Sequence, residues 1–172
     1  LAAAVVQAMA EHYASHPQVI GWQLDNEFDA HGQAGCFCPS CRRAFHDWAK
    51  ARYGTLAALN DAWGTAFWSH VYSAWDQIPL PVDAVGVSNP CLELDYYRFS
   101  SDAVIEFAQA QVEVLRARCP GQFITHNMMA NGFDDVDYYA LAEQLDFASW
   151  DNYPVFSGDA GPAQAALCHD WI

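Results

Sequence analysis

With 172 residues and 53% apolar side chains, the chain is long enough to form one domain of ordinary size with a buried core. Its formal charge of −14, from 21 acidic and 7 basic residues, would repel phosphate backbones and anionic lipids, which argues against nucleic acid and membranes as partners. No apolar run reaches the length of about 18 residues that a bilayer span needs, so we expect a soluble, cytoplasmic protein.

The first predicted elements are a helix and a strand. Residues 1–16 carry apolar side chains at helical spacing, and this helix is expected to end before Pro17. Because the helix is already in progress at Leu1, we expect a piece of a longer protein, truncated at both ends. Residues 19–27 (VIGWQLDNE) are apolar on both alternating faces, which is typical of a strand covered on both sides.

Two more helices and a long loop follow. Residues 41–54 place aromatic side chains on one helical face and end at Gly54, which is a common stop signal. Residues 55–64 predict a shorter helix with Thr55 as its N-cap. Residues 65–90 are aromatic and lack a sustained period, so they predict a long ordered loop, and loops of this length are usually functional.

The second half of the chain alternates helices with strands. Helices are predicted over 92–121 and 134–145, and strands over 122–130 and 146–156. This alternation predicts a parallel sheet with right-handed crossovers. All three predicted strands end in polar or aromatic residues, as in a (β/α)8 barrel, and no glycine-rich phosphate loop follows them, which disfavours a doubly wound sheet. We therefore predict a partial (β/α)8 barrel of the α/β class.

Three of the six cysteines lie within six residues, at Cys36, Cys38 and Cys41. In a CPxC turn the backbone amides point at the thiolates and lower their pKa values, which suits tetrahedral zinc. We interpret residues 28–45 as a zinc-binding insertion. The other three cysteines are expected to be ordinary buried thiols in a reducing cytoplasm: Cys91, Cys119 and Cys168.

Glu27 is the leading catalytic candidate in the sequence. A carboxylate at the end of a buried strand is costly unless it is hydrogen-bonded or protonated, and burial favours the protonated form that acid catalysis requires. The alternative is a structural carboxylate that caps the next segment or pairs with Arg42 or Arg43.

Several motifs in order carry a resemblance to a known family. They are WQLDNEF, a CxCxxC segment, FWSHVYSAWDQIPLP, NPCLELDYYRFSSD, THN and DFASWDNYP. Together they resemble the catalytic barrel of glycoside hydrolase family 42 β-galactosidases, over essentially the whole chain. The resemblance implies roughly strands four to six of a retaining β-galactosidase, with Glu27 as general acid/base and Asn26 bonded to the sugar 2-hydroxyl. In the family the nucleophilic glutamate follows the seventh strand, outside these residues, so the fragment alone is expected to be inactive.

The resemblance also implies substrate contacts. Trp68 would form a wall of the galactose subsite, although a core position is the alternative. Asn127 and Tyr153 are further candidates for contact with a β-galactoside, and Asp151 would either orient Tyr153 or contact the substrate.

The metal and the assembly are likewise implied by the resemblance. Some family members hold a structural, non-catalytic zinc on the cysteine trio and a fourth cysteine from an earlier loop, which would lie upstream of Leu1. Within this chain His31 and His46 are alternative fourth ligands. Family members are often trimers, so a homotrimer of the full-length protein is expected.

Two other interpretations stay open. The chain could belong to another barrel glycosidase of the same clan that acts on a different β-linked sugar. It could instead be a zinc-stabilised carbohydrate-binding or scaffold protein without turnover. A strand ending in glutamate after residue 172 would favour an enzyme over a binding protein.

Overall fold

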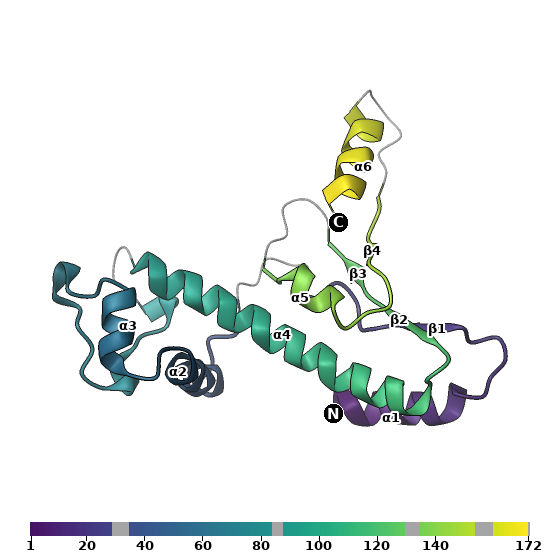
Figure 1. The fold of residues 1–172 in the computed structure, drawn as a ribbon, viewed down its shortest axis with the longest axis horizontal. Helices are drawn as coiled ribbons and strands as arrows, with labels where there is room; N and C mark the ends of the chain where they lie inside the picture. Colours follow the sequence, from purple (N-terminus) through teal and green to yellow (C-terminus); the bar gives the residue numbers. More distant parts are fainter. Residues whose placement is uncertain (29–34, 84–87, 130–134, 154–159, 172) are drawn as a thin grey trace. The chain divides into compact units, whose positions relative to one another are not determined.

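The computed structural model describes residues 1–28, 35–83, 88–129, 135–153 and 160–171. In these residues the chain is a mixed α/β structure in which short parallel strands alternate with helices (Figure 1). The chain divides into two compact units. Unit 1 comprises Leu1–Gly32 and Asp102–Ile172, and unit 2 comprises Gln33–Ser101. No helix in the described part of the chain is both long enough and apolar enough to cross a membrane.

Unit 1 contains two pairs of parallel strands. β1 (Gly21–Gln23) pairs with β2 (Phe123–Thr125), and β3 (Asn127–Met128) pairs with β4 (Ser149–Trp150). The single residue His126 separates β2 from β3. The parallel pairing agrees with the prediction, but the strands are shorter than the predicted runs.

The backbone ladder continues by one residue beyond two of these strands. The Leu24 N–H donates to the Thr125 carbonyl at 2.8 Å, and the Asp151 N–H donates to the Met128 carbonyl at 2.9 Å. The polar residues that follow β1 therefore start where regular pairing with β2 stops.

Helices from both ends of the sequence belong to unit 1 together with these strands. The second half of the long helix α4 lies beside α1 (Figure 1). The side chain of Asp137 caps α5 by accepting from the Tyr139 and Ala140 N–H groups at 3.0 and 3.1 Å. The helices are α1 (Ala2–Tyr13), α4 (Pro90–Arg118), α5 (Tyr138–Ala142) and α6 (Ala160–Trp171).

The core of unit 1 forms where α1 and α4 meet the strands. Ala10 and Ala108 are fully buried and let the two helices approach closely, while Leu24 and Ile124 bring the strands into the same cluster. Burying an aliphatic side chain of this size stabilises a fold by about 1.5–3 kcal/mol. This core fixes the ends of β1 and β2 with respect to each other.

Unit 2 is helical. It contains α2 (Pro39–Tyr53), α3 (Leu56–Ala62), the first part of α4 and three short 3-10 helices, η1 (Phe67–Ser69), η2 (Trp75–Gln77) and η3 (Pro81–Asp83). As predicted, Thr55 caps α3, with its hydroxyl accepting from the Ala58 N–H at 3.2 Å. Gly54 ends α2 with a φ of 71°, a conformation that glycine adopts without steric cost.

An aromatic cluster forms the core of unit 2. The ring of the fully buried Phe45 lies 5.0–6.5 Å, between centroids, from the rings of Trp48, Trp63, Tyr96 and Phe99. These contacts join α2, the end of α3 and the first part of α4. The long loop predicted after α3 packs on this core through Ile78 and Leu80, which are fully buried.

Candidate functional site

The Asn26-Glu27 pair lies in a strained turn directly after β1. Asp25 and Glu27 have positive φ values of 43° and 45°. The left-handed conformation costs about 1–2 kcal/mol for a residue with a side chain, and it persists only where surrounding contacts fix it. The turn must therefore be held by neighbouring groups.

Asn127, at the start of β3, supplies two of those contacts and also bonds Gln23 in β1. Its side-chain oxygen accepts from the Glu27 N–H and from Gln23 Nε2, both at 3.1 Å. Its Nδ2 donates to Asn26 Oδ1 at 3.2 Å. The structure thus brings three predicted site residues together, Asn26, Glu27 and Asn127, and adds Gln23, which the sequence did not single out.

The His126 side chain bonds the backbone on both sides of the same turn. Its ring is fully buried, with Nδ1 at 2.7 Å from the Leu24 carbonyl and Nε2 at 3.3 Å from the Phe28 N–H. A carbonyl only accepts and an amide N–H only donates, so Nδ1 carries the proton and Nε2 accepts. Burial lowers the pKa of His126, which keeps the ring in this neutral form.

The predicted site residues differ in their exposure to solvent. Glu27 is half-buried and Asn26 is exposed. Asp151 is half-buried just beyond β4, and Tyr153 is 80% exposed. The backbone of Trp68 belongs to η1, but its side chain falls outside the described part of the structure.

The three cysteines predicted to bind a metal lie together in unit 2. The sulfur atoms of Cys36, Cys38 and Cys41 all lie within 4.8 Å of one another, and the Cys38 and Cys41 sulfurs are 3.6 Å apart. Tetrahedral zinc with Zn–S bonds of about 2.3 Å places two sulfurs about 3.8 Å apart. The spacing of the Cys38 and Cys41 sulfurs is thus compatible with one tetrahedral ion, and the Cys36 sulfur lies close to both.

The protonation of the trio also suits a cation. N–H groups from Cys41 and Ser40 and neighbouring thiols lower the pKa of Cys38 to about 7, with the Cys41 N–H the largest cause. Burial, and then the neighbouring cysteines, raise the pKa of Cys41 to about 12. The two pKa values shift in opposite directions because the two thiols interact. Cys38 loses its proton first, and the resulting thiolate disfavours a second negative charge on Cys41. A bound cation would remove that repulsion.

The cysteine segment packs against α4. The Tyr96 hydroxyl donates to the Cys36 carbonyl at 2.6 Å, and the Phe37 ring stacks on the Tyr96 ring with centroids 5.2 Å apart. Gly35 has a φ of 80°, and a Cβ there would lie 2.6 Å from the Ser100 hydroxyl. These contacts hold the segment close to α4.

Of the two histidines proposed as a fourth ligand, only His46 lies in the described residues, and it is not part of this cluster. His46 is buried, and its Nε2 bonds to the Ile78 carbonyl at 2.9 Å, while His31 lies outside the described residues. Cys119 and Cys168 are buried free thiols, as predicted, and Cys91 is a half-buried one.

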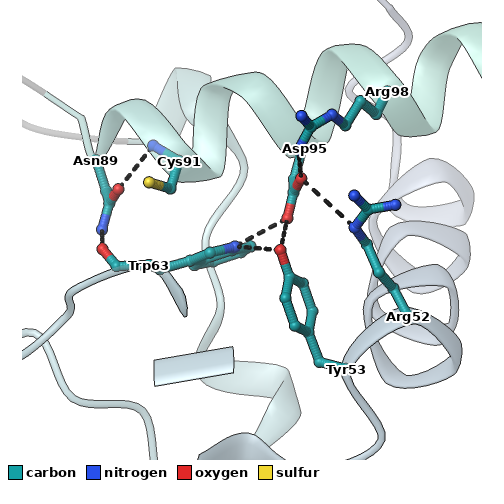
Figure 2. A network of polar contacts seen from close by, with 7 residues as sticks. All are labelled: Arg52, Tyr53, Trp63, Asn89, Cys91, Asp95 and Arg98. Atoms are coloured by element: carbon teal, nitrogen blue, oxygen red, sulfur yellow. Dashed lines mark hydrogen bonds and ion pairs between the residues drawn. The ribbon is translucent and has the colours of Figure 1, made fainter. Parts of the chain in front are cut away.

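A buried carboxylate, Asp95, forms the centre of a hydrogen-bond network in unit 2. Figure 2 shows its side chain on α4 facing groups from α2 and the end of α3. Asp95 is 1% exposed and accepts from Trp63 Nε1 at 2.8 Å, from the Tyr53 hydroxyl, and from Arg98 at 2.9 Å. Arg52 lies at 3.9 Å. One carboxylate therefore ties three helices of unit 2 together.

Comparison with known proteins identifies the family. The family model for glycoside hydrolase family 42, described as β-galactosidase, matches residues 1–172. The chain is 52% identical to the β-galactosidase BgaA of a Thermus species over 158 residues, and 51% identical to a β-galactosidase of Thermus thermophilus over the same length. These alignments cover 92% of this chain and 24% of each relative.

Solved structures agree with these sequence matches. The β-galactosidase of the psychrophilic Marinomonas ef1 superimposes with a TM-score of 0.84 at 41% identity, covering 88% of this chain and 23% of that one. The enzyme of the haloarchaeon Halorubrum lacusprofundi gives a TM-score of 0.84 at 40% identity, covering 95% and 25%. The chain spans about a quarter of the length of these relatives. Because the family model matches every residue, this chain belongs to the glycoside hydrolase family 42 β-galactosidases.

Proposed function

We propose that the chain is part of the catalytic (β/α)8 barrel of a retaining β-galactosidase and contributes roughly strands four to six. The observation that carries this proposal is the match of the family model to residues 1–172, together with an Asn26-Glu27 pair at the C-terminal end of β1. In barrel enzymes the reacting groups are found at that end of the strands.

In this proposal Glu27 is the general acid/base. Its carboxylic acid donates a proton to the glycosidic oxygen as the bond to the anomeric carbon breaks, and its carboxylate then removes a proton from the water that releases the sugar. The second carboxylate of a retaining enzyme attacks the anomeric carbon. That nucleophile is supplied by a part of the full-length protein outside these 172 residues.

The substrate contacts follow the same assignment. Asn26 hydrogen-bonds the sugar 2-hydroxyl, Trp68 forms an apolar wall of the galactose subsite, and Asp151 and Tyr153 contribute from the end of β4. Asn127 acts on substrate partly through its neighbours, because its amide already bonds Asn26 and the Glu27 N–H.

The stereochemistry of hydrolysis tests this function. The full-length protein is incubated with nitrophenyl β-D-galactoside, and the first sugar released is followed by proton nuclear magnetic resonance. We expect β-galactose to appear before mutarotation produces the α anomer. Initial release of the α anomer would contradict a retaining mechanism, and preferential hydrolysis of another β-linked sugar would overturn the substrate assignment.

We further propose that Cys36, Cys38 and Cys41 hold a structural zinc ion, with a fourth ligand from outside the described residues. The support is a cluster of three thiols whose sulfurs lie within 4.8 Å of one another, one of which has its pKa lowered to about 7. Zinc bound entirely by protein ligands has no open position for water or substrate. Its role would be to fix the segment that follows Glu27 in the sequence.

Cys38→Ser tests the metal site. We expect the variant to lose zinc and to melt at a lower temperature, while turnover at low temperature changes little, because a closed zinc site stabilises structure without touching substrate. The measurements are metal content by mass spectrometry, the thermal midpoint, and kcat at a temperature well below that midpoint. Cys91→Ser is the matched control and should keep its zinc.

A catalytic zinc would give a different result. Chelation would then abolish turnover at once while the circular dichroism spectrum stayed unchanged, and this outcome would contradict the structural role.

A further inference from the structure

We propose that His126 is a positioning residue for the Glu27 carboxyl group: its imidazole fastens the backbone on both sides of the Asp25–Glu27 turn. This inference rests on the proposed role of Glu27 as the acid/base. His126 touches neither substrate nor the reacting atoms in this account, and it acts through the turn that it holds.

The geometry of the two ring bonds carries the inference. Nδ1 bonds the carbonyl of Leu24, the last residue before the turn, at 2.7 Å, and Nε2 bonds the N–H of Phe28, the first residue after it, at 3.3 Å. One rigid ring therefore sets the separation between the two ends of a three-residue turn. Without the ring both backbone groups would be buried and unpaired, which native structures avoid.

The surroundings keep the ring in place. The Phe28 ring stacks on it with centroids 4.2 Å apart and planes 18° apart, and the His126 side chain is fully buried. The backbone carbonyl of His126 accepts from the Ser149 hydroxyl at 2.9 Å. The Phe28 stack holds the ring, and the Ser149 bond holds the backbone that carries it.

Histidine is the side chain that this position requires. The ring must donate through one nitrogen and accept through the other, and a neutral imidazole does both across a fixed span. An asparagine places an amide near the Nδ1 position only, and a glutamine reaches the Nε2 position only. Each can therefore replace one of the two bonds.

The turn needs this support because its backbone is strained. Asp25 and Glu27 are both left-handed, and relaxation of either residue would swing the Glu27 side chain. A displacement of about 1 Å at a reacting group can cost about 10²-fold in rate. The Glu27 N–H also bonds Asn127 at 3.1 Å, so His126 and the next residue hold the turn at different points.

His126→Phe in the full-length protein tests the inference, because phenylalanine keeps the stacked ring and removes both bonds. We expect kcat/KM to fall about 10²-fold on lactose and less than about threefold on dinitrophenyl β-galactoside, whose leaving group needs no proton. Azide should raise kcat on the dinitrophenyl substrate and yield β-galactosyl azide. A loss of folded protein would instead lower both rates by the same factor.

Two conservative variants extend the test. His126→Asn keeps a donor for the Leu24 carbonyl, and His126→Gln keeps an acceptor for the Phe28 N–H, so each should lose about tenfold on lactose, less than the phenylalanine variant. If His126→Phe fails to fold, these two variants decide the question by the same comparison of substrates.

His46→Phe is the matched control. His46 is also a buried histidine bonded to a backbone carbonyl, but it belongs to α2 in unit 2. The His46→Phe variant should have a lower thermal midpoint, and its kcat/KM should change by the same factor on both substrates. If the His126 variants behave like this control while Glu27→Gln shows the acid/base pattern, the positioning role is wrong and the proposed function stands. If Glu27→Gln itself lacks that pattern, the proposed function fails first.

Discussion

Glu27→Gln is expected to lower kcat/KM on lactose by about 10²- to 10⁴-fold in the full-length protein. Glutamine keeps the size of the side chain but cannot donate the proton that the departing sugar oxygen requires. The loss should shrink on dinitrophenyl β-galactoside, because dinitrophenolate leaves without protonation. Initial rates on both substrates, measured by a coupled galactose assay and by absorbance, provide the comparison.

The second half of the reaction gives an independent measurement. Without a carboxylate to activate water, the galactosyl intermediate should accumulate until azide captures it as β-galactosyl azide. Glu106→Gln, an exposed glutamate on α4, is the control and should behave as the wild type does. Equal losses on both substrates, with no effect of azide, would remove Glu27 from the acid/base role.

Asp95→Ala is expected to destabilise unit 2 strongly, because it removes a buried carboxylate. It would leave the Tyr53 hydroxyl without its acceptor and Trp63 Nε1 with only its longer bond to that hydroxyl at 3.2 Å, and a buried unpaired group costs about 1–3 kcal/mol. We expect a loss of about 3 kcal/mol in the free energy of unfolding, since Arg52 and Arg98 are half exposed and can turn to water. Urea unfolding followed by circular dichroism measures it.

Asp47→Ala separates burial from charge. Asp47 pairs with Lys50 at 3.0 Å, and its partner lies three residues further along the helix, as Arg98 does for Asp95. The Asp47 side chain is 75% exposed, so its loss should cost less than about 0.5 kcal/mol. Similar urea midpoints for the two variants would show that the buried hydrogen bonds contribute no more than an exposed ion pair.

Local signals predicted the helices well. Thr55 and Gly54 mark helix boundaries through chemistry that belongs to a few neighbouring residues, so the sequence alone locates them. α4 likewise ends just before Pro120, which cannot continue a helix. The cysteine trio was equally predictable, because its members are close in sequence and their spacing brings the sulfurs together.

The strands were predicted in the right order but too long. Residues 19–27 were predicted as one strand, yet the ladder with β2 ends at Leu24, because Asp25 turns into the left-handed region. An apolar pattern reports burial and contains no information on where a partner strand stops. The predicted strand over 146–156 continues beyond residue 153 into residues outside the described part of the structure.

The supports of the turn could not be predicted in the same way. His126 bonds a carbonyl 102 residues earlier in the chain, and Gln23 bonds Asn127 across 104 residues. In the sequence, His126 is only a polar residue near the end of a strand, and Gln23 is one member of an alternating run. Their roles arise from the parallel pairing of β1 with β2, which places the ends of two distant segments together.

The φ value of 45° at Glu27 implies a conflict between conformational preference and chemistry at one position. Asparagine and glycine enter the left-handed region more readily than glutamate does, so the local backbone favours residues that cannot act as an acid. Selection for thermal stability alone would therefore drift away from glutamate here, whereas selection for turnover would retain it. In directed evolution, stabilised clones changed at position 27 should accordingly be recovered only when the screen omits activity.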